Sequence, residues 1–239
     1  QVLYAPYACN PDLYHPLERQ KKYDVTFVGQ GYRGRPELVQ WLKEQGVNIR
    51  LWGQGWEEHP ALRDIAGGFL PHQAMIEVFA QSKIVLGMSW VSGDGVTLQI
   101  KGRTFEYAAC RAFQLTTYDE RLKALFRDGD EIVFYRDRPD LLEKIRYYLA
   151  HPEEREHIAH AAYVRALDDH TWTQRLKQIL EEIVQSRRAK RDAARHCEES
   201  ATPSVAVITY VYNGARYIEE LIQSVLTQTH QDFEFLILD

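Results

Sequence analysis

Apolar runs of strand length alternate with amphipathic stretches over residues 24–135. The runs DVTFVG, KIVLGMS and FQLTT are mostly apolar, and the stretch HQAMIEVFAQ, which precedes the second of them, has helical spacing. Strands separated by helices of about ten residues indicate β-α units and a parallel sheet. We therefore predict an α/β fold with a Rossmann-like parallel sheet. The predicted strands are 24–29, 47–53, 83–89, 113–117 and 131–135, and the predicted helices begin near Pro36 and cover 72–81, 102–112 and 119–129.

Beyond residue 138 the pattern becomes purely helical and then loses its apolar stripe. The domain organisation follows from these changes. We predict a connecting segment at 1–22, rich in Tyr and Pro, and a first domain at 23–184 that ends in helices. Residues 185–202 are a predicted charged linker, and residues 203–239 form a second β-α-β pattern.

The composition limits the classes of function. A net charge of -5 over 239 residues argues against a nucleic-acid binder, which needs clustered Lys and Arg. The three cysteines are far apart and suit a reducing compartment, and no apolar run approaches the roughly 18 residues of a membrane span. We predict a cytoplasmic protein. Five Lys or Arg residues in the linker leave two alternatives open, a solvated helix end or peripheral membrane contact through 187–195.

The loop after the first predicted strand carries glycines in a phosphate-binding spacing. Gly29, Gly31 and Gly34 match G-x-G-x-x-G, in which glycine lets backbone N–H groups approach a diphosphate. A nicotinamide enzyme would also need an acidic residue at the end of the second strand, and none is present. We therefore favour a phosphate-facing loop supplemented by Arg33 or Arg35. A tight strand-helix turn is the structural alternative.

A second candidate cluster stands at the start of the predicted helix 102–112. Lys101 and Arg103 could neutralise a diphosphate together with free helix N–H groups, and Glu106 could accept hydrogen bonds from sugar hydroxyls. The alternative is an ordinary ion pair between Arg103 and Glu106, which are three residues apart. His72 follows another strand end and is a candidate ligand neighbour. The sequence shows no metal-binding pattern, so we predict no metal in this domain.

Taken in order, the motifs KYDVTFVGQGYRGRPEL, RTFEYAACRAFQLTT and HTWTQRL resemble the donor-binding half of a CgeB-like, group 1 GT-B glycosyltransferase. The resemblance covers about residues 1–180. It implies binding of a nucleotide-diphospho-sugar, with Glu106 on the ribose and Arg103 on the phosphates. Two positions depart from the family pattern: Leu98 replaces an earlier glutamate and Arg111 replaces a glycine. No catalytic base is assigned.

The closing stretch VAVITYVYNGARYIEELIQSVLTQTHQDFEFLILD resembles the start of a family-2, GT-A glycosyltransferase domain. The resemblance implies that Thr209, Tyr212 and Asn213 lie near the nucleotide and that Asp239 begins an Asp pair. A divalent cation, Mg or Mn, is implied only for a complete second domain. We expect the chain to be a segment of a longer tandem glycosyltransferase.

The resulting hypothesis is transfer of a sugar from a nucleotide-diphospho-sugar to an acceptor. The acceptor would be a glycan, a lipid-linked sugar or a protein, in surface glycan or polysaccharide synthesis by a hexosyltransferase-type enzyme. The alternative is a catalytically inactive nucleotide-sugar-binding module. We expect the segment on its own to bind a nucleoside diphosphate without transferring sugar.

Overall fold

The computed structural model describes residues 5–89, 99–194, 205–210, 218–230 and 233–238. The chain divides into two compact units, one of Ala8–Thr171 and the other of Gln1–Tyr7 with Trp172–Asp239. Each unit is described by itself.

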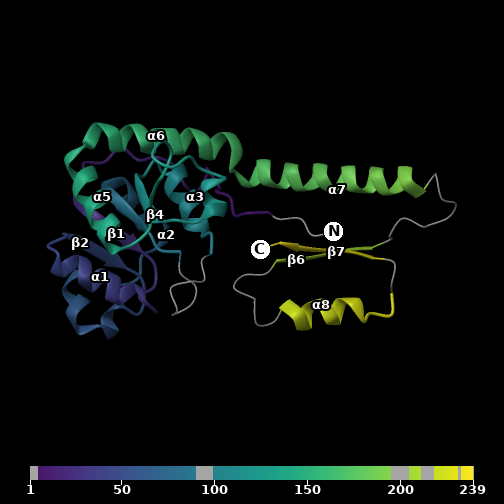
Figure 1. Ribbon diagram of the computed structural model, residues 1–239, viewed down its shortest axis with the longest axis horizontal. Helices are drawn as coiled ribbons and strands as arrows, with labels where there is room; N and C mark the ends of the chain where they lie inside the picture. Colours follow the sequence, from purple (N-terminus) through teal and green to yellow (C-terminus); the bar gives the residue numbers. More distant parts are fainter. Residues whose placement is uncertain (1–4, 90–98, 195–204, 211–217, 231–232, 239) are drawn as a thin grey trace. The chain divides into compact units, whose positions relative to one another are not determined.

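The larger unit is built on a five-stranded sheet in the order β2-β1-β3-β4-β5 (Figure 1). Each neighbouring pair is parallel, with register partners such as Val25 and Ile49 between β1 and β2. The predicted α/β fold with a Rossmann-like parallel sheet is therefore confirmed. The strands are β1 (Tyr23–Val28), β2 (Ile49–Trp52), β3 (Ser82–Gly87), β4 (Gln114–Thr117) and β5 (Val133–Tyr135).

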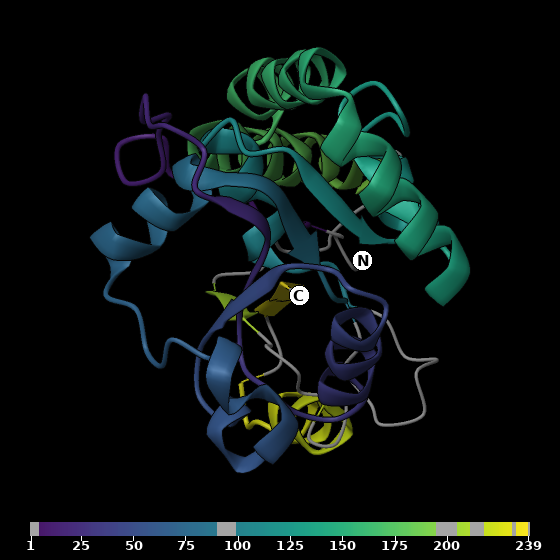
Figure 2. The same ribbon diagram turned by 90° about the vertical axis from the view of Figure 1, so that its left-hand side faces the viewer.

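Helices cover both faces of this sheet (Figure 2). Alternate strand residues point to opposite faces. Ile84 and Leu86 of β3 therefore join one buried cluster with residues of α1, α5 and α6, and Val85 joins another with residues of α2 and α3. Such double burial explains why the strands are apolar on both faces. The helical segments are α1 (Arg35–Glu44), η1 (Trp56–Glu58), η2 (Pro60–Ile65), α2 (His72–Gln81), α3 (Gly102–Ala109), α4 (Glu120–Lys123), α5 (Arg138–Ala150) and α6 (Pro152–Asp169).

The predicted helix 119–129 is wrong in its length, because α4 ends at Lys123. Beyond it the carboxylate of Glu131 accepts a hydrogen bond from the amide of Arg127, and Gly129 adopts a φ of 80°. These features turn the chain toward β5. Arg111, at the position where the family pattern has glycine, adopts a φ of 53° after α3, a conformation that glycine favours.

The smaller unit contains α7 (Trp172–Ala194), β6 (Val205–Tyr210), α8 (Ile218–Leu226) and β7 (Phe233–Leu238). The strands β6 and β7 form a two-stranded parallel sheet with Val205 opposite Phe233. Helix α7 continues to Ala194, into the segment 185–202 that was predicted to be a linker. The predicted domain boundaries otherwise stay predictions.

Some sequence interpretations concern residues for which the structure gives no description. Leu98, Tyr212, Asn213 and Asp239 all lie outside the described residues. Within the described part of the chain, the helices are too short or too polar to cross a bilayer.

Candidate functional site

The order of the strands places a ligand site between β1 and β3. The chain leaves β1 toward β2 on one side, and β3 lies on its other side. The place where the connections from neighbouring strands run in opposite directions is the topological switch point of the sheet. In open α/β sheets, ligands bind there, beyond the carboxyl ends of the strands. The loop from β1 to α1 and the segment after β3 therefore flank the candidate site. Helix α3, with Lys101 just before it, is the next described element after that segment along the chain.

The first two glycines of the loop after β1 have packing roles. The amide of Gly29 donates to the carbonyl oxygen of Trp52 at 2.8 Å, and the amide of Gly31 donates to that of Gln54 at 2.9 Å. A Cβ atom on Gly31 would lie 2.6 Å from the ring of Trp56. Both amides are thus engaged within the protein, and the tight-turn alternative accounts for these glycines. Contact with a donor at Gly29 and Gly31 stays a prediction.

Arg33 and Arg35, treated as equivalent from the sequence, have different surroundings. Arg35 is 6% exposed, and its Nη1 and Nη2 donate to the carbonyl oxygens of Gln30 and Met88 at 3.0 and 2.9 Å. Arg33 is exposed and has a φ of 58°. Arg35 therefore ties the loop after β1 to the segment after β3.

A sequence signal for the buried arginine was present but not used. Arg35 is in helical phase with Leu38, Val39 and Leu42, which are the buried apolar positions of α1. Arg33 lies before the helix and outside this phase. The phase distinguishes the buried structural arginine from the exposed one.

Lys101 lies at the N-cap position of α3. Burial, and then the positive charges of Arg35 and Arg33, together lower the pKa of Lys101 to about 8. Its Nζ donates to Oε1 of Gln99 at 2.6 Å. The positive charges of two arginines from another segment of the chain thus act on Lys101, and a bound diphosphate would stabilise its charged form.

Arg103 and Glu106 form the ion pair that the sequence left open. Nη1 of Arg103 donates to Oε2 of Glu106 at 2.7 Å, and the two side chains are 32% and 21% exposed. The guanidinium also lies over the ring of Phe79, 5.8 Å from its centroid. The residues between and after this pair, such as Phe105 and Tyr107, are buried. The pair is therefore on the open side of α3 and accessible to a ligand.

His72 is the first residue of α2 and contacts a residue that the sequence analysis missed. Its ring meets that of Tyr14 edge-on, with centroids 4.7 Å apart and planes at 73°. Burial, and then the negative charge of Glu106, raise the pKa of Tyr14. Tyr14 was missed because residues 1–22 show no periodicity and were interpreted as a connection. The structure thus brings His72 together with Tyr14, a residue of the segment before β1.

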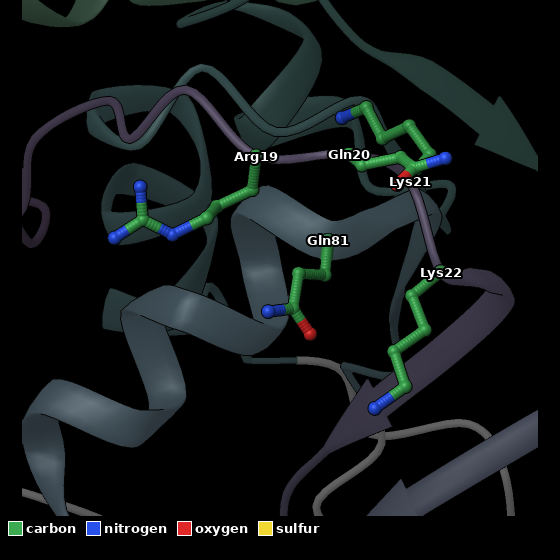
Figure 3. A pocket seen from close by; sticks show the side chains of 5 residues that line it. All are labelled: Arg19, Gln20, Lys21, Lys22 and Gln81. Atoms are coloured by element: carbon green, nitrogen blue, oxygen red, sulfur yellow. The ribbon is translucent and has the colours of Figure 1, made fainter.

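A hollow of about 460 Å³ lies at a different place, where α2 ends and β1 begins (Figure 3). Its wall includes the cations Arg19, Lys21 and Lys22, whose side chains point in different directions in Figure 3. Arg19 is already paired with Glu77 at 2.7 Å. This hollow at the amino edge of the sheet is therefore a poor anion site.

Metal-binding side chains do not cluster in the described ranges. No group of three or more His, Cys, Asp or Glu residues there is arranged to hold a metal ion. Cys9 and Cys110 are buried free thiols, and burial raises their pKa values to about 11 and about 12.

Comparisons with known proteins agree with this geometry. Residues 33–181 match the family described as glycosyl transferase-like. The chain is 25% identical over 179 residues to the spore protein CgeB of Bacillus subtilis (strain 168), covering 68% of this chain and 55% of that protein. The chain thus spans about half the length of this curated relative.

Solved structures show the same fold at low sequence identity. Sucrose-phosphate synthase from Thermosynechococcus elongatus has a TM-score of 0.60 and 13% identity over 77% of this chain and 52% of that one. Anabaena HepE, crystallised with UDP-glucose, has a TM-score of 0.53 and 15% identity over 66% of this chain and 48% of that one. Together with the family match, they confirm the predicted GT-B-type fold.

Proposed function

Because this chain belongs to the glycosyl transferase-like family, we propose that its larger unit binds a nucleotide-diphospho-sugar as the donor of a sugar-transfer reaction. The observation that carries the proposal is the partly exposed ion pair of Arg103 and Glu106 in α3, with Lys101 at the N-cap of the same helix. The complex of HepE with UDP-glucose supports the class of donor. Hexosyl transfer in surface glycan or polysaccharide synthesis is the proposed setting, with a glycan, lipid-linked or protein acceptor.

In the proposed reaction, an acceptor hydroxyl attacks the anomeric carbon and the nucleoside diphosphate leaves with two negative charges or more. Lys101, Arg103 and the free N–H groups at the start of α3 stabilise this charge as it develops. Glu106 accepts hydrogen bonds from the ribose hydroxyls. Because Arg103 and Glu106 are paired in the structure, Arg103 exchanges part of its contact with Glu106 for a phosphate oxygen when the donor binds.

Further parts of the proposal concern the cation requirement and the smaller unit. The larger unit is proposed to work without a bound metal. The smaller unit is proposed to be the start of a GT-A domain, which as a complete domain would use Mg or Mn, and Thr209 of β6 would lie near its nucleotide. Peripheral membrane contact is proposed for residues 187–195.

Titration calorimetry with UDP and with inorganic pyrophosphate tests the donor site. Arg103→Ala should weaken UDP binding by about 1.5–3 kcal/mol, the usual scale for a charge-assisted hydrogen bond. Glu106→Gln should weaken UDP binding more than pyrophosphate binding, since only UDP has a ribose. The control is Arg146→Ala, which removes an exposed arginine of α5 and should leave both affinities unchanged. Equal UDP affinity in wild type and Arg103→Ala would exclude the phosphate role.

A binding module without turnover is the second candidate, and it has one supporting observation. Leu98 stands where related enzymes carry a glutamate, which removes a carboxylate from the predicted sugar contacts. Release of sugar from UDP-sugar donors by the complete natural protein would exclude this alternative. Binding without turnover over a broad panel of donors and acceptors would favour it.

A further inference from the structure

Helix α2 packs against α3, and two of its side chains lie next to Arg103. Met75 and Phe79 are four residues apart, so they are on the same side of α2. Both are buried, and they belong to one hydrophobic cluster with Tyr107 of α3. The partly exposed side chain of Arg103 therefore has a buried surface of the neighbouring helix beside it.

Met75 and Phe79 contact the guanidinium of Arg103 in two different ways. Nη1 of Arg103 donates a hydrogen bond to Sδ of Met75, and the centre of the guanidinium lies over the ring of Phe79, 5.8 Å from its centroid. The ring of Phe79 in turn meets that of Tyr107 edge-on, with centroids 4.8 Å apart, which fixes its orientation. The guanidinium is thus held by α2 as well as by Glu106 of its own helix.

Both contacts from α2 hold Arg103 without neutralising it. A thioether sulfur is a weak acceptor and a phenyl ring has no net charge, so the guanidinium keeps its attraction for an anion. Nη2 and Nε of Arg103 have no hydrogen-bond partner among the residues that the structure describes. A guanidinium can direct two such groups at two oxygens of one phosphate. Met75 and Phe79 therefore restrict the movement of Arg103 and leave these donors to a ligand.

We propose that Met75 is a positioning residue of the donor site, which holds Arg103 in place for the phosphates of a nucleoside diphosphate. The inference rests on the proposed donor function of the larger unit. A long side chain that is already ordered loses less conformational entropy when the ligand binds. Met75 acts through Arg103, so it affects the binding of phosphate groups, in inorganic pyrophosphate and in a nucleoside diphosphate alike.

The experiment uses Met75→Leu in the full chain, because leucine has a similar volume and removes only the sulfur acceptor, an exchange that buried sites usually tolerate. Calorimetric titration measures the affinity for inorganic pyrophosphate and for whichever of UDP, ADP and GDP binds tightest. We expect both affinities to fall about three- to fivefold, because Arg103 becomes less restricted. In the Arg103→Ala background, Met75→Leu should change the nucleotide affinity by less than about 1.5-fold, because its partner is already absent.

A matched control is the next residue of the same helix. Ile76 is buried in the same cluster as Met75, so Ile76→Leu makes a similar change in packing without removing a sulfur atom, and it should leave both affinities unchanged. A Met75→Leu variant that keeps wild-type affinity for pyrophosphate, or that weakens nucleotide binding equally with and without Arg103, would overturn the positioning role alone. If Arg103→Ala binds both ligands like wild type, the phosphate role of Arg103 and the role of Met75 fail together. If the wild-type chain binds none of the four ligands, the donor site fails as well.

Discussion

The buried guanidinium of Arg35 donates a hydrogen bond from Nη2 to the carbonyl oxygen of Met88, which is 2.9 Å away. Its Nη1 donates to the carbonyl oxygen of Gln30, so one side chain joins the loop after β1 to the segment after β3. These are the two segments that flank the switch point of the sheet. The shape of the candidate site therefore depends on an arginine that is itself nearly inaccessible.

Replacing Arg35 should consequently cost stability. Arg35→Met leaves two carbonyl oxygens without their charge-assisted partner and should lower the free energy of unfolding by about 2–4 kcal/mol. The control Arg33→Met changes an exposed arginine of the same loop and should alter it by less than about 0.5 kcal/mol. Urea denaturation followed by tryptophan fluorescence measures both. Similar midpoints for the two variants would contradict the structural role of Arg35.

The glycines of the same loop should differ in their tolerance of a side chain. Gly31→Ala places a Cβ atom 2.6 Å from the ring of Trp56 and should destabilise the protein by about 1–3 kcal/mol. Gly34→Ala is the control, because a Cβ atom there meets nothing within 4 Å and φ is -67°. Thermal denaturation compares the stability of the two variants with that of the wild-type protein. A packing role for Gly31 would be wrong if both alanines were tolerated equally.

Binding of a diphosphate should depend on pH through Lys101. The pKa of Lys101 in the free protein is about 8, lowered by burial and by Arg35 and Arg33, and a bound anion should raise it again. Below about pH 8 the amine is already protonated, so affinity should change little there on account of this group. Above about pH 8 binding must take up a proton, and affinity should fall as the pH rises toward the pKa of the bound state.

Calorimetry checks this linkage. Titration of UDP at pH 8.5 in Tris and in HEPES, whose ionisation enthalpies differ, should give different apparent binding enthalpies because a proton is taken up. In the Lys101→Met variant, the difference in apparent binding enthalpy between the two buffers should become smaller. An unchanged difference in that variant would assign the proton to another group.

The two-stranded sheet of the smaller unit should be less protected than the sheet of the larger one. Of the described side chains in β6 and β7, Leu236 alone is buried, at 4% exposed, whereas Val25 and Ile84 of the larger sheet are fully buried. A parallel pair of strands needs cover on both faces and has free edges. We expect the amides of 205–210 and 233–238 to exchange much faster than those of 25–28 and 84–87. Equal protection in a monodisperse monomer would show that this prediction was wrong.

The sequence by itself determined the elements and the class of fold. The period of the apolar residues is a local property, so it predicted the strands of the parallel sheet, such as KIVLGMS, and the helix 72–81 without knowledge of their neighbours. The spacing of Arg103 and Glu106 also allowed for their ion pair, as one of two alternatives, because residues three apart share one side of a helix. The Gly-rich loop was predicted from the spacing of its glycines, and the structure shows that Gly31 packs against Trp56 of the next loop.

Only the tertiary structure decided which residues meet at the site. The end of α4, the burial of Arg35 against Met88 and the contact of Tyr14 with His72 depend on chain segments that are far apart in the sequence. Such contacts are set by the order of the strands and by the packing of helices on the sheet, and neither leaves a periodic signal in the segment itself. The segment around Tyr14 has no periodicity because its position is fixed by hydrogen bonds to distant elements and not by a repeating apolar face.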